Sequence, residues 1–267
     1  MSVWWYVVIL LVSVSVSGQA ADTLRVPAWG VGGNVQNHYF VDVLQLALDK
    51  TVSTDGELSI EVGPRSDSSA RDMMYLKQGQ KIDVLWFGTS PELEANFLAV
   101  KISLLKDLNR YRVLMIRQDD RARFEAINSV DDLRRLTGGS GANWPSTAML
   151  KRNDLPVITV INTQLLSGML KAKRIDYMAR NLSEAWDESL LYKDDGFVLE
   201  NRLLLDGGVD FYFFFNKSNI RLANRIERGI KIAQADGSFD RLFEAVPGFK
   251  HGQQLLQDPK RIKLSLK

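Results

Sequence analysis

The most constraining feature of this chain is an α/β segment flanked on each side by an apolar strand. Residues 129–181 alternate between predicted strands and helices, and the flanking strands cover 111–117 and 210–216. A chain that enters one α/β unit through a first strand and leaves it through a second builds two lobes joined by two crossings. We therefore predict a two-lobed α/β protein with mixed sheets flanked by helices, two hinge crossings and a cleft between the lobes.

The N-terminal segment has the character of an export signal. Residues 1–20 carry no charged side chain, and 4–16 form an apolar run. This run is short for a membrane span, and small residues precede the first charge at Asp22. We interpret 1–20 as a signal peptide cleaved after Ala20 and expect a periplasmic protein. An uncleaved anchor is the alternative, because no lysine or arginine precedes the apolar run.

The composition argues against several kinds of site. The chain has no cysteine and two histidines, His38 and His251, so we expect no metal site and no cofactor. A net charge of +2 with both signs mixed gives no reason to expect a nucleic-acid partner. The chain lacks a phosphate-binding loop, a dinucleotide fingerprint and a convincing Ser–His–Asp order, so no catalytic residue is predicted and the protein is not expected to be an enzyme.

Hydrophobic periodicity and capping signals place the other elements. The predicted strands are 24–27, 58–62, 82–87, 156–161 and 175–179, and the predicted helices are 40–50, 69–78, 91–97, 129–136, 145–152, 163–170, 181–191, a long helix through 222–233, and 238–245. The basic segment 251–267 is expected to pack loosely.

Several short stretches, in this order, resemble one known family. They are 130–133, the glycine turn 138–141, 173–176, the strand 210–216 and 235–239. Together they are similar to a divergent branch of the type II periplasmic solute-binding proteins, family 3 (polar amino acid) class, over about 24–249.

The resemblance implies a particular division of the chain. Lobe 1 would comprise 21–109 and 210–267, the latter including the C-terminal tail, and lobe 2 would comprise 110–209. The hinge would lie near 109–112 and 207–210, where Gly207 and Gly208 permit a change of backbone angles.

The sequence departs from the family where amino-acid ligands are held. Leu93 occupies the place at which the family has an arginine that binds the ligand carboxylate. Asn181, preceded by Arg180, occupies the place of the aspartate that takes the ligand ammonium. We therefore do not transfer specificity for ordinary α-amino acids.

Ligands of open α/β lobes bind at the carboxyl ends of strands and at helix N-termini. Trp29 is suited to stack on a ring or a methyl-rich group, and Arg180 to hold a carboxylate or another anion. The competing interpretations are core packing for Trp86, helix capping for Ser90 and Asn181, and an ion pair with Glu184 for Arg180. The predicted ligand-binding residues are Trp29, Trp86, Thr89, Ser90, Asn143, Trp144, Arg180 and Asn181.

The predicted function is capture of a small polar or anionic organic molecule by hinged closure, for transport or sensing. The resemblance implies an ABC permease or a membrane sensor as partner, and we expect a monomer. Two alternatives stay open. One is a dehydratase-like periplasmic enzyme on the same scaffold, with Glu92, Glu94 or His38 in an acid–base role. The other is a degenerate lobe pair kept as an interaction module.

Overall fold

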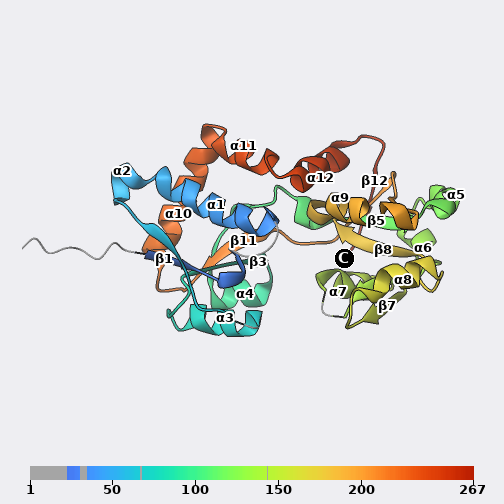
Figure 1. Cartoon of the computed structure of the whole chain (residues 1–267), viewed down its shortest axis with the longest axis horizontal. Helices are drawn as coiled ribbons and strands as arrows, with labels where there is room; N and C mark the ends of the chain where they lie inside the picture. Colours follow the sequence, from blue (N-terminus) through green and yellow to red (C-terminus); the bar gives the residue numbers. More distant parts are fainter. Residues whose placement is uncertain (1–22, 31–34, 67, 143) are drawn as a thin grey trace, which may run out of the picture.

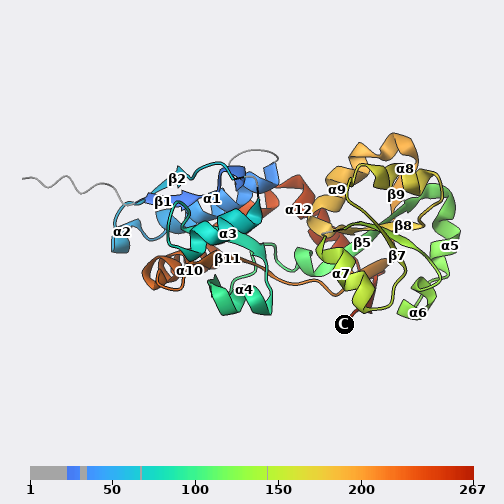
Figure 2. The same ribbon diagram turned by 90° about the horizontal axis from the view of Figure 1, so that it is seen from below.

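The chain forms two α/β lobes, which lie side by side in Figures 1 and 2. The computed structural model describes residues 23–30, 35–66, 68–142 and 144–267. The predicted signal peptide, 1–20, lies outside these ranges. None of the helices within them combines the length and the apolarity needed to cross a membrane.

Lobe 1 is built on two small sheets. One is the parallel pair β1 (Thr23–Val26) and β2 (Ser59–Val62), and the other is an antiparallel sheet in the order β3 (Val84–Gly88), β11 (Phe211–Phe215), β4 (Leu98–Val100). Strand β11 returns from lobe 2 and occupies the centre of its sheet, so three consecutive phenylalanines, 213–215, are buried on both faces. The helices of this lobe are α1 (Val35–Asp49), α2 (Val52–Asp55), α3 (Ser69–Lys77), α4 (Pro91–Asn96), α10 (Ile220–Ala235) and α11 (Ser238–Glu244).

Lobe 2 is built on one mixed seven-stranded sheet. Its central strand, β5 (Tyr111–Arg117), is buried along its whole length and pairs antiparallel with β8 (Tyr177–Asn181). The strand order is β12 (Ile262–Ser265), β10 (Leu203–Asp206), β5, β8, β6 (Gly138–Gly141), β7 (Val157–Val160), and β9 (Phe197–Leu199) also pairs with β5. The helices are α5 (Arg121–Glu125), α6 (Val130–Leu133), α7 (Pro145–Arg152), α8 (Leu165–Lys171) and α9 (Leu182–Leu191).

Three helix starts follow the side chains that the sequence marks as caps. The Ser90 hydroxyl accepts a hydrogen bond from the Leu93 N–H at 3.1 Å, and Pro91 is the first residue of α4. Ser129 caps α6 in the same way, and the Asn181 side chain accepts from the Ser183 N–H at 3.2 Å. Each cap satisfies an N–H that lacks a partner inside its helix, and this confirms that capping signals locate these helix starts.

Two of the crossings between the lobes run side by side and are hydrogen-bonded to each other. The Asn109 side-chain amide donates to the Val209 carbonyl at 2.8 Å, and the Gly208 N–H donates to the Arg110 carbonyl at 2.9 Å. A Cβ on Gly208 would lie 2.3 Å from the Asn109 carbonyl oxygen. Gly208 is not among the glycines with positive φ, so its role in this structure is to let the two backbones approach closely.

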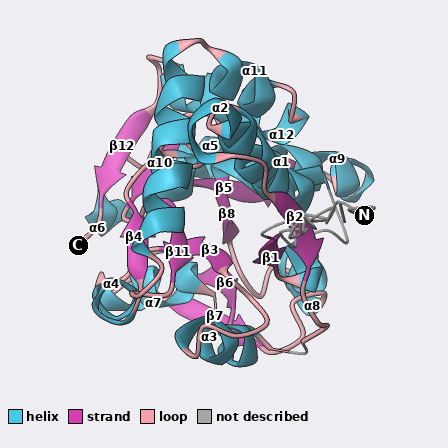
Figure 3. Ribbon diagram, turned by 90° about the vertical axis from the view of Figure 1, so that its left-hand side faces the viewer, coloured by secondary structure: helices cyan, strands magenta, loops and turns pink. Residues whose placement is uncertain are grey.

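The C-terminal segment forms a third crossing, which the sequence analysis did not predict. Helix α12 (Pro247–Gln257) follows α11, lies between the lobes in Figure 2 and packs against α9 of lobe 2. Strand β12 then pairs in parallel with β10, and Figure 3 shows it along one side of the molecule. The assignment of all of 210–267 to lobe 1, with a loosely packed tail, is thereby corrected. The alternating pattern Ile262-Lys-Leu-Ser265 is typical of a half-buried strand, and the pairing with β10 places that strand in the lobe 2 sheet.

Alanine at Gly208 is expected to reduce the free energy of unfolding by about 1–3 kcal/mol, because the added Cβ forces the paired crossings apart. Urea denaturation followed by circular dichroism measures this. The matched control is Gly168→Ala in α8, where no atom lies within 4 Å of the added Cβ. That change is expected to be neutral or to stabilise by up to about 1 kcal/mol. Equal stability of the two variants would contradict the role assigned to Gly208.

Candidate functional site

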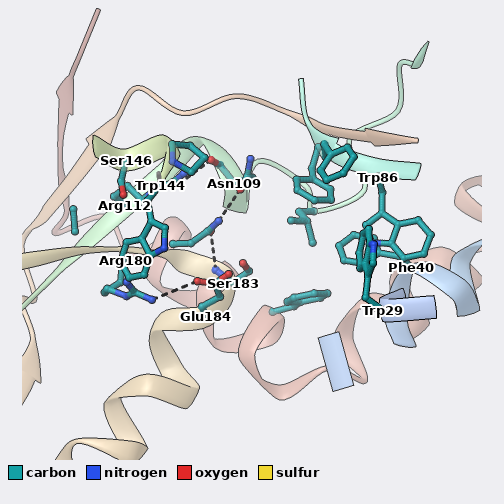
Figure 4. A pocket seen from close by; sticks show the side chains of 17 residues that line it. Trp29, Phe40, Trp86, Asn109, Arg112, Trp144, Ser146, Arg180, Ser183 and Glu184 are labelled. Atoms are coloured by element: carbon teal, nitrogen blue, oxygen red, sulfur yellow. Dashed lines mark hydrogen bonds and ion pairs between the residues drawn. The ribbon is translucent and has the colours of Figure 1, made fainter. Parts of the chain in front are cut away.

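A cavity of about 450 Å³ lies between the lobes and is lined by residues from both. Figure 4 shows its two walls: Trp29, Phe40 and Trp86 on one side, and mainly polar side chains on the other. The volume is in the range of small-molecule sites, and such sites occur preferentially between domains. The position is therefore that of the cleft expected from the two-lobed architecture.

The wall contributed by lobe 1 is aromatic. Trp29, in the short turn after β1, meets Trp86 of β3 edge to face with ring centroids 5.0 Å apart. Phe40 of α1 stacks on Trp86 at 5.6 Å and on Phe211 of β11 at 5.2 Å. The Trp29 indole N–H donates to the buried Asp72 carboxylate at 2.8 Å. Because that donor is occupied, Trp29 contributes its ring to the wall and no free hydrogen-bond donor.

Arg112 is the central feature of the lobe 2 wall. It is the second residue of β5, directly after the first crossing, and is only 5% exposed. Its Nη1 donates to the carbonyls of Asn109 at 2.8 Å and Tyr111 at 3.0 Å. Burial lowers the pKa of Arg112 to about 10, the negative charge of Glu184 opposes this fall, and the group is still charged at neutral pH. Arg112 forms no ion pair with a carboxylate among the described residues, and the nearby Glu184 and Glu188 pair with Arg180.

Arg180, near the end of β8, already has a carboxylate partner. Its guanidinium donates through two nitrogens to Glu188 of α9, and Glu184 lies 3.7 Å away. Burial raises the pKa of Glu188, and the positive charge of Arg180 opposes that rise. The guanidinium also lies over the Trp144 ring, 4.3 Å from its centroid. Arg180 therefore positions Trp144 in the wall as well as carrying charge.

Trp144 is held from its other side by the glycine strand. A Cβ on Gly141 would lie 2.7 Å from the Trp144 indole. The ring therefore rests on a backbone without a side chain, and Pro145 starts α7 directly after it. The run Gly138-Gly-Ser-Gly141 thus has a packing role, which explains glycine at the last of these positions.

Asn109 joins the wall of the cavity to the hinge. Its side-chain oxygen accepts from the Asn181 amide at 2.6 Å, and its own amide donates across to the second crossing at Val209. Its carbonyl accepts from Arg112. One residue thus connects both crossings, the end of β8 and the buried guanidinium, and a ligand that moves Arg112 would act directly on the hinge.

The structure brings five of the eight predicted residues to the cavity: Trp29, Trp86, Trp144, Arg180 and Asn181. Thr89 and Ser90 are not among the lining residues. The Thr89 hydroxyl donates to Glu94 at 2.7 Å, and Ser90 caps α4. Asn143 lies outside the described residues.

Sequence reasoning missed Arg112, Asn109, Phe40, Phe211 and Glu184, which also line the cavity. The sequence did contain a signal for Arg112. A charged residue inside the otherwise apolar strand Tyr111-Arg-Val-Leu-Met-Ile116 would be buried, and a buried charge needs hydrogen bonds or a group of opposite charge. Phe40 begins the predicted helix 40–50 and Phe211 lies in the predicted strand 210–216, and neither position marks its residue as part of a cavity. Only the packing of α1 against β3 and β11 turns them toward a common wall.

The residues considered for acid–base chemistry lie elsewhere. Glu92, Glu94 and His38 do not line the cavity, and hydrogen bonds from Lys101 and Thr89 lower the pKa of Glu94. Glu184 is the carboxylate that lines it, with a side chain 48% exposed. Among the described residues, no cluster of histidine, cysteine, aspartate and glutamate has the arrangement needed to hold a metal ion.

No protein-family model matches the chain, and no curated protein matches it. Many solved structures resemble it. The L-cystine solute receptor of Neisseria gonorrhoeae, in an unliganded open conformation, is 19% identical over 86% of this chain and 94% of that one, with a TM-score of 0.60. A probable amino-acid ABC transporter extracellular-binding protein from Bacillus subtilis is 17% identical over 85% and 98%, with a TM-score of 0.62.

A third similar structure bears on the enzyme alternative. It is an ancestral amino acid-binding protein described as a precursor of cyclohexadienyl dehydratase, 16% identical over 84% of this chain and 95% of that one, with a TM-score of 0.57. These likenesses show that the chain shares the two-lobed fold of these three structures. The neighbours are mostly binding proteins.

Proposed function

We propose that the protein is an exported solute-binding protein that captures a small polar or anionic organic molecule by hinged closure of its lobes. The observation that carries the proposal is the buried, positively charged Arg112 in the wall of a cavity shared by both lobes, without a carboxylate partner among the described residues. An isolated buried charge is costly unless a partner of opposite charge arrives. A ligand anion supplies that partner.

Closure follows from contacts that a ligand makes with both walls. A ligand shifts the balance between open and closed forms only by its difference in affinity for the two. A molecule anchored on Arg112 and covered by the lobe 1 aromatics has more contacts in the closed form. Asn109, which links Arg112 to both crossings, provides the mechanical connection.

The proposal extends to the setting of the protein. A periplasmic location after cleavage of 1–20, a monomeric state, and an ABC permease or membrane sensor as partner are in keeping with the fold of the similar structures. The closed form would be the state that such a partner recognises. The protein needs no cofactor for this task.

The dehydratase-like alternative is supported by one feature, the Glu184 carboxylate at the cavity. Acid–base catalysis also needs a second titratable group in reach of the substrate, and Glu92, Glu94 and His38 lie outside the lining. Mass spectrometry of any bound molecule after prolonged incubation tests this alternative, and conversion of the molecule would favour the enzyme. The interaction-module alternative calls for a filled apolar cleft, whereas Arg112, Asn109 and Asn181 converge on this one.

A thermal-shift screen of the purified protein against small metabolites is expected to find a compound that raises the melting temperature. A ligand at about 100 times its Kd stabilises by roughly 2.7 kcal/mol, or about 5–10 °C for a chain of this size. The same compound should reduce the radius of gyration measured by small-angle X-ray scattering. A library without any stabilising compound, or stabilisation without compaction, would contradict capture by closure.

A further inference from the structure

The two walls of the cavity differ in chemistry, and the difference defines a class of ligand. Among the described lining residues, those of lobe 1 carry no charge: they are aromatic apart from Leu105 and Asn109, and Asn109 lies at the crossing into lobe 2. The rings pack on one another at 5.0–6.1 Å, so they form a continuous platform and not an open cage. A platform of packed rings suits a flat apolar body that stacks on it.

Within the described ranges, the opposite wall supplies one cation that forms no ion pair. Arg180 is neutralised by Glu188, and Glu184 lies 3.7 Å from the same guanidinium. The amides of Asn109 and Asn181 bond to each other. Arg112 is thus the cavity cation without an ion pair among the described residues, and both of its recorded hydrogen bonds come from Nη1. A single guanidinium with unused N–H groups is matched by a single carboxylate.

The described residues offer a ligand ammonium no carboxylate of its own. Those near the cavity are Glu184 and Glu188, and both lie within ion-pair distance of Arg180. An ammonium between two guanidinium groups would be repelled and would have to compete with Arg180 for Glu184. The wall therefore favours a ligand that has a carboxylate and no ammonium group over a zwitterion.

We infer that the ligand is a monocarboxylic acid with a flat aromatic body and no ammonium group, its carboxylate on Arg112 and its ring against the Trp29–Phe40–Phe211 face of lobe 1. The inference rests on the proposed function and specifies its substrate class. The probe is 3-phenylpropionate, which joins one ring to one carboxylate.

Isothermal titration calorimetry of the purified protein compares 3-phenylpropionate with four relatives. The neutral 3-phenylpropionamide should bind about 10- to 100-fold more weakly, because it loses charge-assisted hydrogen bonds. Propionate should bind at least about 30-fold more weakly, because it has no ring to bury. L-Phenylalanine and glycine betaine should each bind at least about 10-fold more weakly, because both carry a positive charge.

A variant tests the stacking separately. Phe211→Leu should weaken 3-phenylpropionate about 3- to 10-fold and leave 3-cyclohexylpropionate within about twofold, because only the aromatic ring loses a stacking partner. The matched control is Tyr75→Leu, an aromatic residue of lobe 1 that does not line the cavity. It should change neither affinity. The comparison among ligands in the unaltered protein does not depend on whether a variant folds.

The outcomes separate this inference from the function on which it rests. Tighter binding of L-phenylalanine or glycine betaine than of 3-phenylpropionate, or equal binding of the amide, overturns the inference and leaves the solute-binding function standing. The same holds if the metabolite screen finds a compound of another class that closes the lobes while 3-phenylpropionate does not bind. Absence of any compound that closes the lobes overturns both.

Discussion

Substitution of Arg112 by glutamine is expected to weaken binding of 3-phenylpropionate by about 100-fold or more, while the unliganded protein becomes as stable as the wild type or more so. The loss of affinity follows from removing the buried cation that meets the carboxylate. The stability of the unliganded protein follows from relieving an unpaired buried charge, which costs on the order of 1–3 kcal/mol. The lowered pKa of Arg112 has the same origin, because burial disfavours the charged form.

Calorimetry and urea denaturation measure the two parts of this prediction. Arg112→Lys should retain part of the affinity, because it keeps the charge and loses the planar fork. The control is Arg135→Gln, an exposed lobe 2 arginine whose nearest carboxylate is 4.0 Å away, and it should leave both quantities unchanged. A large loss of stability in Arg112→Gln without loss of affinity for 3-phenylpropionate would show that the guanidinium stabilises the first crossing and does not bind a ligand.

The pH dependence of binding supplies an independent check on Arg112. The group stays charged below about pH 10, and the probe's carboxyl group is ionised above roughly pH 5. Affinity should therefore be constant between about pH 6 and 9 and should fall as the pH drops through the carboxyl pKa of the probe. An affinity that rises at low pH would indicate recognition of the neutral acid.

Removal of the Glu188 carboxylate is expected to lower the free energy of unfolding by about 2–4 kcal/mol. Glu188→Leu leaves the largely buried Arg180 charge without its principal partner, and breaking a buried pair on one side is strongly destabilising. Adding Arg180→Met to the same chain should recover most of the loss, because two apolar side chains then replace the pair. The double-mutant cycle isolates the coupling between the two residues.

An exposed ion pair of the same lobe is the matched control. Lys171 and Asp195 lie 2.9 Å apart with side chains 67% and 41% exposed. Their coupling in the cycle Lys171→Met, Asp195→Leu is expected to stay below about 0.5 kcal/mol. Similar coupling in both cycles would show that the Arg180–Glu188 pair behaves as an ordinary surface pair.

The two arginines illustrate how far the candidate site could be predicted. The sequence directs attention to Arg180, because it follows a strand and precedes a helix start, and the structure does place it at the cavity. Glu188, eight residues further along, lies nearly two turns into α9, and only the folded helix shows that it meets Arg180. Tertiary contacts alone decide that Arg180 forms an ion pair and that Arg112 forms none among the described residues.

The same limit applies to the C-terminal segment. Helix α12 places Phe249 against Tyr39 of α1, with ring centroids 4.9 Å apart, and His251 stacks on Trp186 of α9 at 3.6 Å. A Cβ on Gly252 would lie 2.5 Å from the Leu182 carbonyl oxygen, so the two helices approach closely. These contacts join residues 65 or more positions apart in the chain, and no local pattern in 247–265 indicates which lobe receives it.

The sequence by itself determined many of the helices and strands, the caps Ser90, Ser129 and Asn181, and the two-lobed character of the fold. These depend on hydrophobic period and on hydrogen bonds between residues a few positions apart, such as Ser129 with Asp132. Only the tertiary structure decided that rings from β3, β11 and α1 form one wall, that Arg112 opposite them forms no ion pair with any described residue, and that the C-terminal strand joins the lobe 2 sheet. Burial and charge pairing depend on which distant segments meet, and that is settled when the whole chain packs.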